Sequence, residues 1–160
     1  MTIKIGDKLP DGTLYEMSED GPKPVSVAEL TAGKRIVIFG LPGAFTPTCS
    51  ALHVPGYVAQ AEQIKAKGID QIVCLSVNDA FVMGAWGKDQ KVGDKVRMLG
   101  DGSGLWTKAL GLELDLVAKG LGMRCERFSM LVDNGVVKSL NVEAPGKFEV
   151  SDAQSMLNSL

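Results

Sequence analysis

The chain has 160 residues, with 17 basic and 19 acidic side chains and a net charge of −2. This near-neutral balance argues against a nucleic-acid-binding protein, because phosphate contacts require a concentrated basic surface. Hydrophobic residues make up 45% of the chain, enough for a substantial core, yet no apolar run approaches the roughly 18 residues that span a bilayer. We therefore expect one domain over residues 1–160 that binds neither nucleic acid nor a membrane.

The N-terminal residues and the cysteines indicate a reducing compartment. Residues 1–8 lack the apolar stretch of a secretory signal and the arginines of a transit peptide, so we expect a cytoplasmic protein. Three widely spaced cysteines, Cys49, Cys74 and Cys125, fit reduced thiols better than a disulfide framework. Their spacing, with a single histidine, matches no zinc ligand set, and we expect no metal or other cofactor.

Two short apolar, β-branched runs, residues 35–41 and 71–77, predict strands that are buried on both faces, as in a parallel sheet. Between them, residues 50–68 carry apolar side chains at helical spacing. This segment ends at Gly68, a residue suited to terminate a helix. The order predicts a β-α-β unit.

The next segment continues the alternation of strands and helices. Asn78 and Asp79 are good capping residues and predict the start of a helix that carries Phe81 and Trp86. Residues 96–99 then predict a further short strand.

The last part of the chain predicts a hairpin and a helix. Residues 128–132 and 136–140 flank Asp-Asn-Gly at 133–135, and Asn-Gly is a strong signal for a tight antiparallel turn. Ser151 and Asp152 cap a helix that runs to Leu160. Together the elements predict a single-domain α/β protein with a central mixed β-sheet flanked by helices, for which a thioredoxin-like fold is the natural candidate.

Cys49 lies where the first buried strand is joined to the long helix. Thr46 is a sound N-cap and Pro47 suits the first helical position, so Cys49 falls in the first turn. Unpaired amides and the positive end of the helix dipole stabilise a thiolate there. Pro42 and Gly43 form a turn that can bring backbone N–H groups up to the sulfur. A buried structural cysteine is the alternative, but these polar, capped flanks favour a nucleophile.

Other sulfur chemistries fit less well. A cysteine hydrolase would pair Cys49 with a histidine base, and His53 follows Cys49 by only four residues. Two groups on one helix seldom reach the required geometry, because in such enzymes the base and the residue that orients it come from separate segments. We therefore expect His53 to pack or to make a local hydrogen bond, and Pro55 to kink the helix just beyond it. A dithiol oxidoreductase requires Cys-x-x-Cys at this junction, and Thr46 occupies the first of those positions.

The spacing of Pro42, Thr46 and Cys49 matches the signature Pro-x-x-x-Thr-x-x-Cys of the peroxiredoxins. The chain resembles the type II, or peroxiredoxin-five-like, branch of this family over essentially its whole length. Three blocks carry the wider resemblance: residues 41–56, 74–82 and 127–132.

The resemblance implies a role for each of these residues in a thiol peroxidase. Cys49 would attack the peroxide O–O bond and become a sulfenic acid, while Thr46 would hydrogen-bond the thiolate and the peroxide. Pro42 would shield the site from solvent, and Arg127 would hold the sulfur ionised and stabilise charge in the transition state. Arg124 lies three residues earlier, but the Arg-Phe-Ser-Met context selects Arg127.

Hydrogen peroxide and small alkyl hydroperoxides are the implied substrates, and antioxidant defence is the implied role. Gly43 and Phe45 are candidates for the substrate pocket. The resemblance also implies a homodimer, for which Phe45, Phe81 and Trp86 are apolar candidates unless they belong to the core.

The sequence leaves open which thiol reacts with the sulfenic acid to resolve it. Cys74 aligns with a cysteine that plant type II members are thought to use, but it lies in a strand that should be buried. Residues 142–160 contain no C-terminal resolving cysteine, and Cys125 is interpreted as a bystander in a basic loop. Glutathione or a glutaredoxin, or thioredoxin, is the external alternative.

Two other functions are compatible with the same fold. One is a thioredoxin-fold thiol-disulfide reductase, which the missing Cys-x-x-Cys disfavours. The other is a non-catalytic redox-sensing or chaperone module, which a reactive thiolate at Cys49 would argue against.

Overall fold

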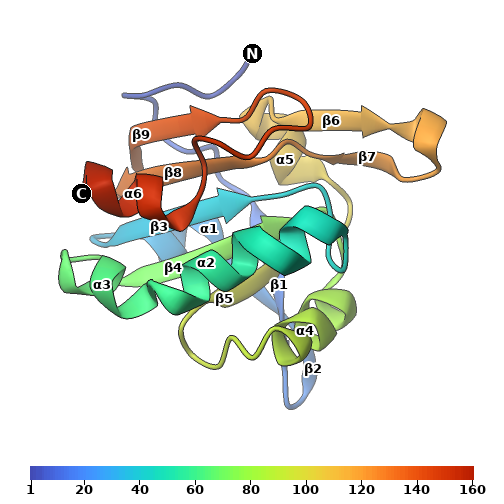
Figure 1. The fold of residues 1–160 in the computed structure, drawn as a ribbon, viewed down its shortest axis with the longest axis horizontal. Coiled ribbons are helices and arrows are strands. Elements are labelled where there is room, and N and C mark those ends of the chain that lie inside the picture. Colours follow the sequence, from blue (N-terminus) through green and yellow to red (C-terminus); the bar gives the residue numbers. More distant parts are fainter.

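The computed structural model describes residues 1–160, and a mixed β-sheet runs through its centre (Figure 1). The strands are β1 (Thr13–Ser18), β2 (Gly21–Ser26), β3 (Arg35–Gly40), β4 (Gln71–Ser76), β5 (Arg97–Gly100), β6 (Glu113–Leu116), β7 (Gly122–Cys125), β8 (Phe128–Asp133) and β9 (Val136–Val142). Seven of them form one sheet in the order β2-β1-β5-β4-β3-β8-β9, and β6 pairs with β7 separately. β4 lies parallel to β3 and β5, whereas the outer pairings are antiparallel.

Helices cover both faces of this sheet. They are α1 (Val27–Thr31), η1 (Cys49–His53), α2 (Val54–Ala59), α3 (Ala61–Ala66), α4 (Ala80–Asp89), α5 (Leu105–Leu110), η2 (Val117–Lys119) and α6 (Ala153–Ser159). One face of the sheet buries side chains from α2, α3, α4 and α6, and the other buries side chains from α1 and α5. No helix has the length and apolar character needed to cross a bilayer. The predicted thioredoxin-like α/β fold, with a mixed sheet between helical layers, is confirmed.

The buried strands, the tight turn and the helix caps that the sequence predicts are all present in the structure. β3 and β4 are almost entirely buried and pair in parallel, as the two apolar runs predict. Asn134 and Gly135 both take positive φ values, 48° and 80°, which is the geometry of a tight turn between β8 and β9. The side chains of Asp79 and Asp152 accept hydrogen bonds from the amides three residues later and so cap α4 and α6.

The segment predicted as one helix, residues 50–68, is divided into three parts. Helical conformation begins at Pro47, widens into the π-helical turn η1, continues as α2 and breaks at Gln60 before α3. Pro55 has no amide proton to donate to a carbonyl in the preceding turn, so the hydrogen-bond ladder changes register where the sequence predicts a kink. Gly68, at a φ of 90°, ends α3 as expected.

The first hairpin of the sheet, formed by β1 and β2, was not predicted. β2 contains Pro22 and Pro24, which weaken a strand prediction because proline cannot donate to a ladder. β2 lies at the edge of the sheet and pairs only with β1, so two missing donors are tolerated there. The helix α5 and the β6-β7 hairpin were also not predicted.

Candidate active site

The Cys49 sulfur lies at the start of η1, directly after the buried strand β3 and its connecting loop. Cys49 is fully buried, and its Sγ accepts a hydrogen bond from Nη2 of Arg127 at 3.2 Å. Arg127 lies between β7 and β8, 78 residues farther along the chain. Because the end of β3 pairs with the start of β8, the sheet brings the two side chains together where these strands end and begin. The structure therefore places the predicted cysteine and the predicted arginine in direct contact.

His53 is the second partner of Arg127. Its Nδ1 lies 2.9 Å from Nη1 of Arg127, and its Nε2 lies 3.1 Å from the Ser151 carbonyl oxygen. A carbonyl oxygen can only accept, so Nε2 carries the ring proton and Nδ1 accepts from the guanidinium. His53 is fully buried and packs against Phe39, as one of the two expected alternatives has it, but its hydrogen bonds reach distant residues and are not local. The one histidine of the chain orients the arginine that touches the sulfur.

No carboxylate forms an ion pair with Arg127. The two ion pairs in the structure involve Arg35 and Arg97. Burial, followed by the nearby Arg127 charge, lowers the pKa of His53 to about 3, so the ring is neutral near pH 7. A neutral acceptor holds the guanidinium in place without opposing its charge. The positive charge is therefore free to stabilise a thiolate on Cys49.

Thr46 begins the helical segment, although its hydroxyl group makes a different contact from the one expected. Its carbonyl accepts from the Ser50 amide at 3.0 Å, as an N-cap residue does, but its Oγ1 donates to the Gly43 carbonyl at 2.6 Å. The single hydroxyl proton is thus used within the loop, and no Thr46–Cys49 hydrogen bond is present. Thr46 can still accept a hydrogen bond from the O–H of a peroxide through its lone pairs.

Two side chains hold the loop around Pro42 from outside. Arg124 donates from Nη1 to the Pro42 carbonyl at 3.3 Å, and Oδ1 of Asn78 accepts from the Ala44 amide at 3.0 Å. A Cβ on Gly43 would lie 2.6 Å from Nη1 of Arg124, so glycine permits this close approach. Arg124 and Asn78 therefore position the loop.

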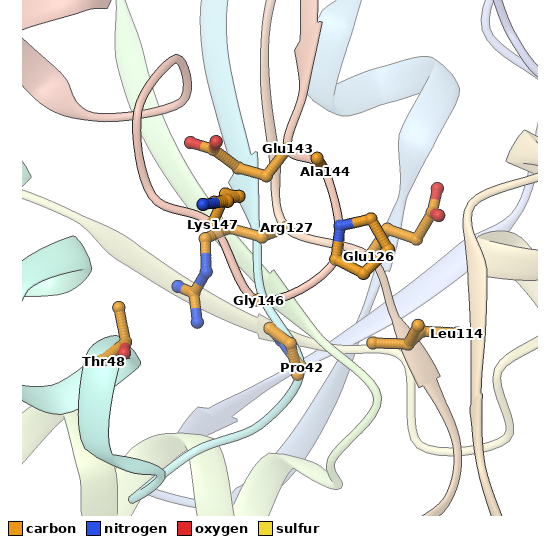
Figure 2. A pocket seen from close by; sticks show the side chains of 10 residues that line it. Pro42, Thr48, Leu114, Glu126, Arg127, Glu143, Ala144, Gly146 and Lys147 are labelled. Atoms are coloured by element: carbon orange, nitrogen blue, oxygen red, sulfur yellow. The ribbon is translucent and has the colours of Figure 1, made fainter.

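A cavity of about 110 Å³ opens beside the site (Figure 2). Its lining residues are Pro42, Thr48, Leu114, Glu126, Arg127, Glu143, Ala144, Pro145, Gly146 and Lys147. Arg127 both lines the cavity and donates to the sulfur, so this side chain connects the cavity with Cys49. Gly43 and Phe45, the expected pocket residues, do not line it, and the Phe45 side chain is 54% exposed.

The other two cysteines lie in the core. Cys74 is fully buried in β4, in the middle of the sheet, and Cys125 is fully buried at the end of β7, not in a loop as expected. Burial raises the pKa of both thiols well above the ordinary value, which disfavours their thiolates. All three cysteines are free thiols, and no cluster of metal-ligating side chains is present.

The aromatic candidates for a dimer surface divide into two kinds. Trp86 is fully buried and donates from Nε1 to the Ser50 hydroxyl at 3.1 Å, so it belongs to the core and not to a surface. Phe45 and Phe81 are 54% and 62% exposed.

The loop that joins β9 to α6, residues 143–152, was not predicted to be part of the site. Ser151 contacts His53 through its carbonyl, Phe148 lies with its ring 5.1 Å from the imidazole, and Glu143 lines the cavity. The sequence marks Ser151 only as a helix cap, and no local motif marks Glu143 or Phe148. The four-residue spacing of Cys49 and His53 predicts only that His53 lies near the sulfur.

The chain is similar to known proteins along its whole length. The Redoxin family matches residues 4–157. Peroxiredoxin-2C of Arabidopsis thaliana is 53% identical over 159 residues, covering 99% of this chain and 98% of that protein. Chloroplastic peroxiredoxin-2E of the same plant is 53% identical over 163 residues, covering 99% of this chain and 70% of that protein.

Solved structures agree with the sequence comparisons. Reduced Prx3 of Vibrio vulnificus in complex with hydrogen peroxide has a TM-score of 0.95 and 51% identity, with 99% of each chain covered. A protein described as a putative thioredoxin reductase of Burkholderia cenocepacia has a TM-score of 0.98 and 60% identity, covering 100% of this chain and 99% of that one.

Proposed function

The chain belongs to the peroxiredoxins, thiol peroxidases of the redoxin family, and we propose that Cys49 is the residue that attacks the peroxide. The observation that carries the proposal is the 3.2 Å contact between Cys49 Sγ and Nη2 of Arg127. A guanidinium without a carboxylate partner favours the thiolate, and the thiolate is the nucleophilic form of cysteine. The Arg127 side chain also lines the cavity, through which we propose that the peroxide enters.

The reaction that we propose has one bond formed and one broken. The thiolate attacks one peroxide oxygen, the O–O bond breaks, and Cys49 becomes a sulfenic acid. The other oxygen leaves with the bonding electron pair and takes a proton to become water, or an alcohol when the substrate is an alkyl hydroperoxide. Negative charge develops on this leaving oxygen, so the fixed donors of Arg127 lower the barrier.

Thr46 and Pro42 complete the proposed site. Because the Thr46 hydroxyl already donates to Gly43, its free lone pairs are suited to accept the O–H of the substrate and orient it toward the sulfur. Pro42 lines the cavity with an apolar ring that carries no amide proton, which limits competition from water at the sulfur.

We propose that an external thiol resolves the sulfenic acid. Peroxiredoxins are reduced by thiol proteins, and Cys74 is poorly suited to the task here because it is buried in the central strand with its thiol protonated. The incoming thiol displaces hydroxide from the sulfenic sulfur and forms a mixed disulfide and water. A second thiol then releases Cys49. Glutathione with a glutaredoxin, or thioredoxin, has the required chemistry.

One experiment tests both the nucleophile and its resolution. The reduced protein receives one equivalent of hydrogen peroxide, and its thiols are then mapped by mass spectrometry with a sulfenic-acid trap. We expect trapped sulfenic acid at Cys49 alone. A Cys49–Cys74 disulfide, absent from Cys74→Ser, would overturn the external route, and an unoxidised Cys49 would overturn its role as nucleophile.

Comparing reductants identifies the external thiol. Turnover is measured with glutathione alone, with glutathione and glutaredoxin, and with thioredoxin, each at matched thiol concentration. We expect protein thiols to sustain turnover better than glutathione alone. Equal rates with all three would contradict a specific protein reductant.

We also propose a homodimer and a cytoplasmic location. Phe45, Leu52 and Phe81 expose 54–62% of their surface and are apolar, which supports a contact with a second copy. Sedimentation that shows only monomer at micromolar concentration would reject the dimer. Three reduced cysteines fit a reducing compartment, and cell fractionation tests the location.

A further inference from the structure

The carboxylate of Glu143 is held by the loop that follows it. The residue is only 7% exposed, and its oxygens accept hydrogen bonds from the amides of Glu149, Val150 and Ser151 at 2.8–2.9 Å. The Ser151 hydroxyl donates a further bond at 2.7 Å. Burial by itself raises the pKa of Glu143, but these four donors outweigh it and the pKa falls below its usual value. Near neutral pH the group is a carboxylate, able to accept all of these bonds.

The residue at the end of this loop contacts the active-site histidine. The Ser151 carbonyl accepts from Nε2 of His53 at 3.1 Å and from the Tyr57 hydroxyl at 2.9 Å, so both of its lone pairs are used. The direction of this carbonyl sets which nitrogen of His53 carries the proton. It therefore also sets which nitrogen is left to accept from Arg127.

The same loop packs on the ring and on the guanidinium. The Phe148 ring lies edge-on to His53, with centroids 5.1 Å apart, and the Cζ atom of Arg127 lies 5.8 Å from the Phe148 centroid. Figure 2 shows Glu143, Lys147 and Arg127 around one cavity. Movement of this loop would therefore disturb the contacts of Arg127 with both His53 and Phe148.

We propose that Glu143 is a positioning residue for the peroxidase reaction: by binding the amides of residues 149–151 it aims the Ser151 carbonyl at His53 and so holds Arg127 on the Cys49 sulfur. This inference rests on the proposed role of Cys49. Glu143 acts through three other residues and touches neither the sulfur nor the substrate.

Two physical effects of removing this carboxylate have opposite signs. A negative charge near the site disfavours the Cys49 thiolate, so loss of the charge alone makes Cys49 more reactive at a given pH. Loss of the loop geometry moves Arg127 away from the sulfur and makes Cys49 less reactive. The direction of the change in reactivity therefore separates a positioning role from a simple charge effect.

The test is the pH dependence of Cys49 alkylation by iodoacetamide, mapped by mass spectrometry, in Glu143→Gln. We expect the midpoint to move to higher pH and the rate of reaction with hydrogen peroxide at pH 7 to fall about tenfold or more. Glu149→Gln is the matched control, because it removes one charge from the same loop and leaves the backbone N–H in place. Its midpoint should stay at the wild-type value or fall slightly, because only a charge is lost. A midpoint that is unchanged or lower in Glu143→Gln, or equally raised in both variants, overturns the proposal.

A second readout observes the histidine directly. His53 is the only histidine, so a two-bond ¹H–¹⁵N spectrum of the imidazole reports one residue. We expect a single tautomer with the proton on Nε2 in the wild type and a mixture in Glu143→Gln. An unchanged single tautomer contradicts the mechanism.

A further variant covers the case in which Glu143→Gln does not fold. Ser151→Ala removes only the hydroxyl donor and leaves the three amides, and it should shift the alkylation midpoint in the same direction by a smaller amount. No shift in Ser151→Ala would then overturn the proposal. Neither alkylation nor the tautomer depends on peroxide, so failure of the proposed function, seen as an unreactive Cys49 in the wild type, is a separate result.

Discussion

Nδ1 of His53 accepts a hydrogen bond from Nη1 of Arg127 at 2.9 Å, across 74 positions of sequence. The acceptor is neutral, so it fixes the direction of the guanidinium and leaves its charge intact. A carboxylate in the same place would make a stronger bond but would offset that charge. The site thus combines a firm hold on Arg127 with an uncompensated positive charge at Cys49.

Replacing the proposed nucleophile should abolish activity. Cys49→Ser replaces the nucleophilic sulfur with a hydroxyl group, which is a far weaker nucleophile, so peroxide consumption should fall to the uncatalysed background. Cys125→Ser, which changes a buried thiol outside the site, serves as the control in a ferrous-oxidation peroxide assay. Substantial peroxidase activity in Cys49→Ser would remove the basis of the proposed mechanism.

A lysine at position 127 should not replace the arginine. Its ammonium is a compact point charge and cannot reach both His53 and Cys49 with a planar fork of donors. We expect Arg127→Lys to lower the rate constant with hydrogen peroxide by roughly 100-fold, the usual cost of losing one transition-state donor. Stopped-flow kinetics under single-turnover conditions measure this rate.

The matched control for that change is Arg124→Lys. Arg124 donates only to backbone carbonyls of Pro42 and Leu121, so the expected loss is much smaller. Equal losses in the two variants would mean that both arginines act only by holding the loop.

His53 should make stability depend on pH in a defined window. Its pKa is about 3 in the folded state and about 6.5 when unfolded, so the unfolded chain binds more protons between these values. Stability is therefore fully present above pH 6.5 and declines as the pH falls toward 3. From pH 7 to pH 5 the wild type should lose about 2 kcal/mol more than His53→Gln, which lacks the titrating ring.

Urea unfolding of both proteins at the two pH values gives the difference, because other titrating groups are common to both. Equal losses in the wild type and His53→Gln would show that the folded protein takes up a proton on His53 in this range.

Asn78 should matter for activity although it lies outside the motif. Its Oδ1 accepts from the Ala44 amide at 3.0 Å and from the Ser76 hydroxyl at 2.6 Å. Asn78→Ala leaves both donors unpaired and frees the loop that carries Pro42, so we expect a loss of about 1–3 kcal/mol in stability and about tenfold in kcat/KM. Asn78→Asp keeps the acceptor and should retain most of both. Urea unfolding and steady-state kinetics compare the variants, and equal effects in the two would contradict a role for the acceptor.

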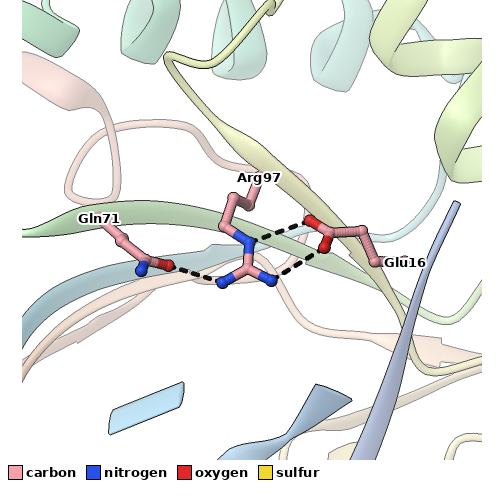
Figure 3. A network of polar contacts seen from close by, with 3 residues as sticks. All are labelled: Glu16, Gln71 and Arg97. Carbon is pink, nitrogen blue, oxygen red and sulfur yellow. Dashed lines mark hydrogen bonds and ion pairs between the residues drawn. The ribbon is translucent and has the colours of Figure 1, made fainter. Parts of the chain in front are cut away.

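The polar contacts of Arg97 should stabilise one half of the sheet. Arg97 donates to both oxygens of Glu16 at 2.9 Å and to Gln71 at 2.8 Å, which joins β5 to β1 and β4 (Figure 3). Both side chains of this ion pair are partly buried and the pair is bidentate, so Glu16→Gln should lower the free energy of unfolding by about 1–2 kcal/mol.

The comparison for that change is the more exposed ion pair between Arg35 and Asp133, whose atoms are 4.0 Å apart. Asp133→Asn should change the free energy of unfolding by about 0.5 kcal/mol or less, because such surface pairs contribute little. Thermal unfolding measures both variants, and a larger loss in Asp133→Asn would contradict this ranking.

Short-range features of the chain were predictable because each depends on residues a few positions apart. The buried strands β3 and β4, the Asn134-Gly135 turn and the Asp79 cap all follow from local hydropathy, turn geometry or one side-chain hydrogen bond. The placement of Cys49 at a helix start follows from the same kind of signal.

Long-range contacts of the site could not be read in this way. His53 meets Ser151 across 98 positions, and Arg127 meets Cys49 across 78, because β3 pairs with β8 and the loop after β9 folds back over the helix. No periodicity or cap encodes these pairings. Local hydrogen bonding thus makes the nucleophile recognisable in the chain, whereas the packing of the sheet supplies the neutral histidine, the loop carbonyl and the uncompensated arginine around it.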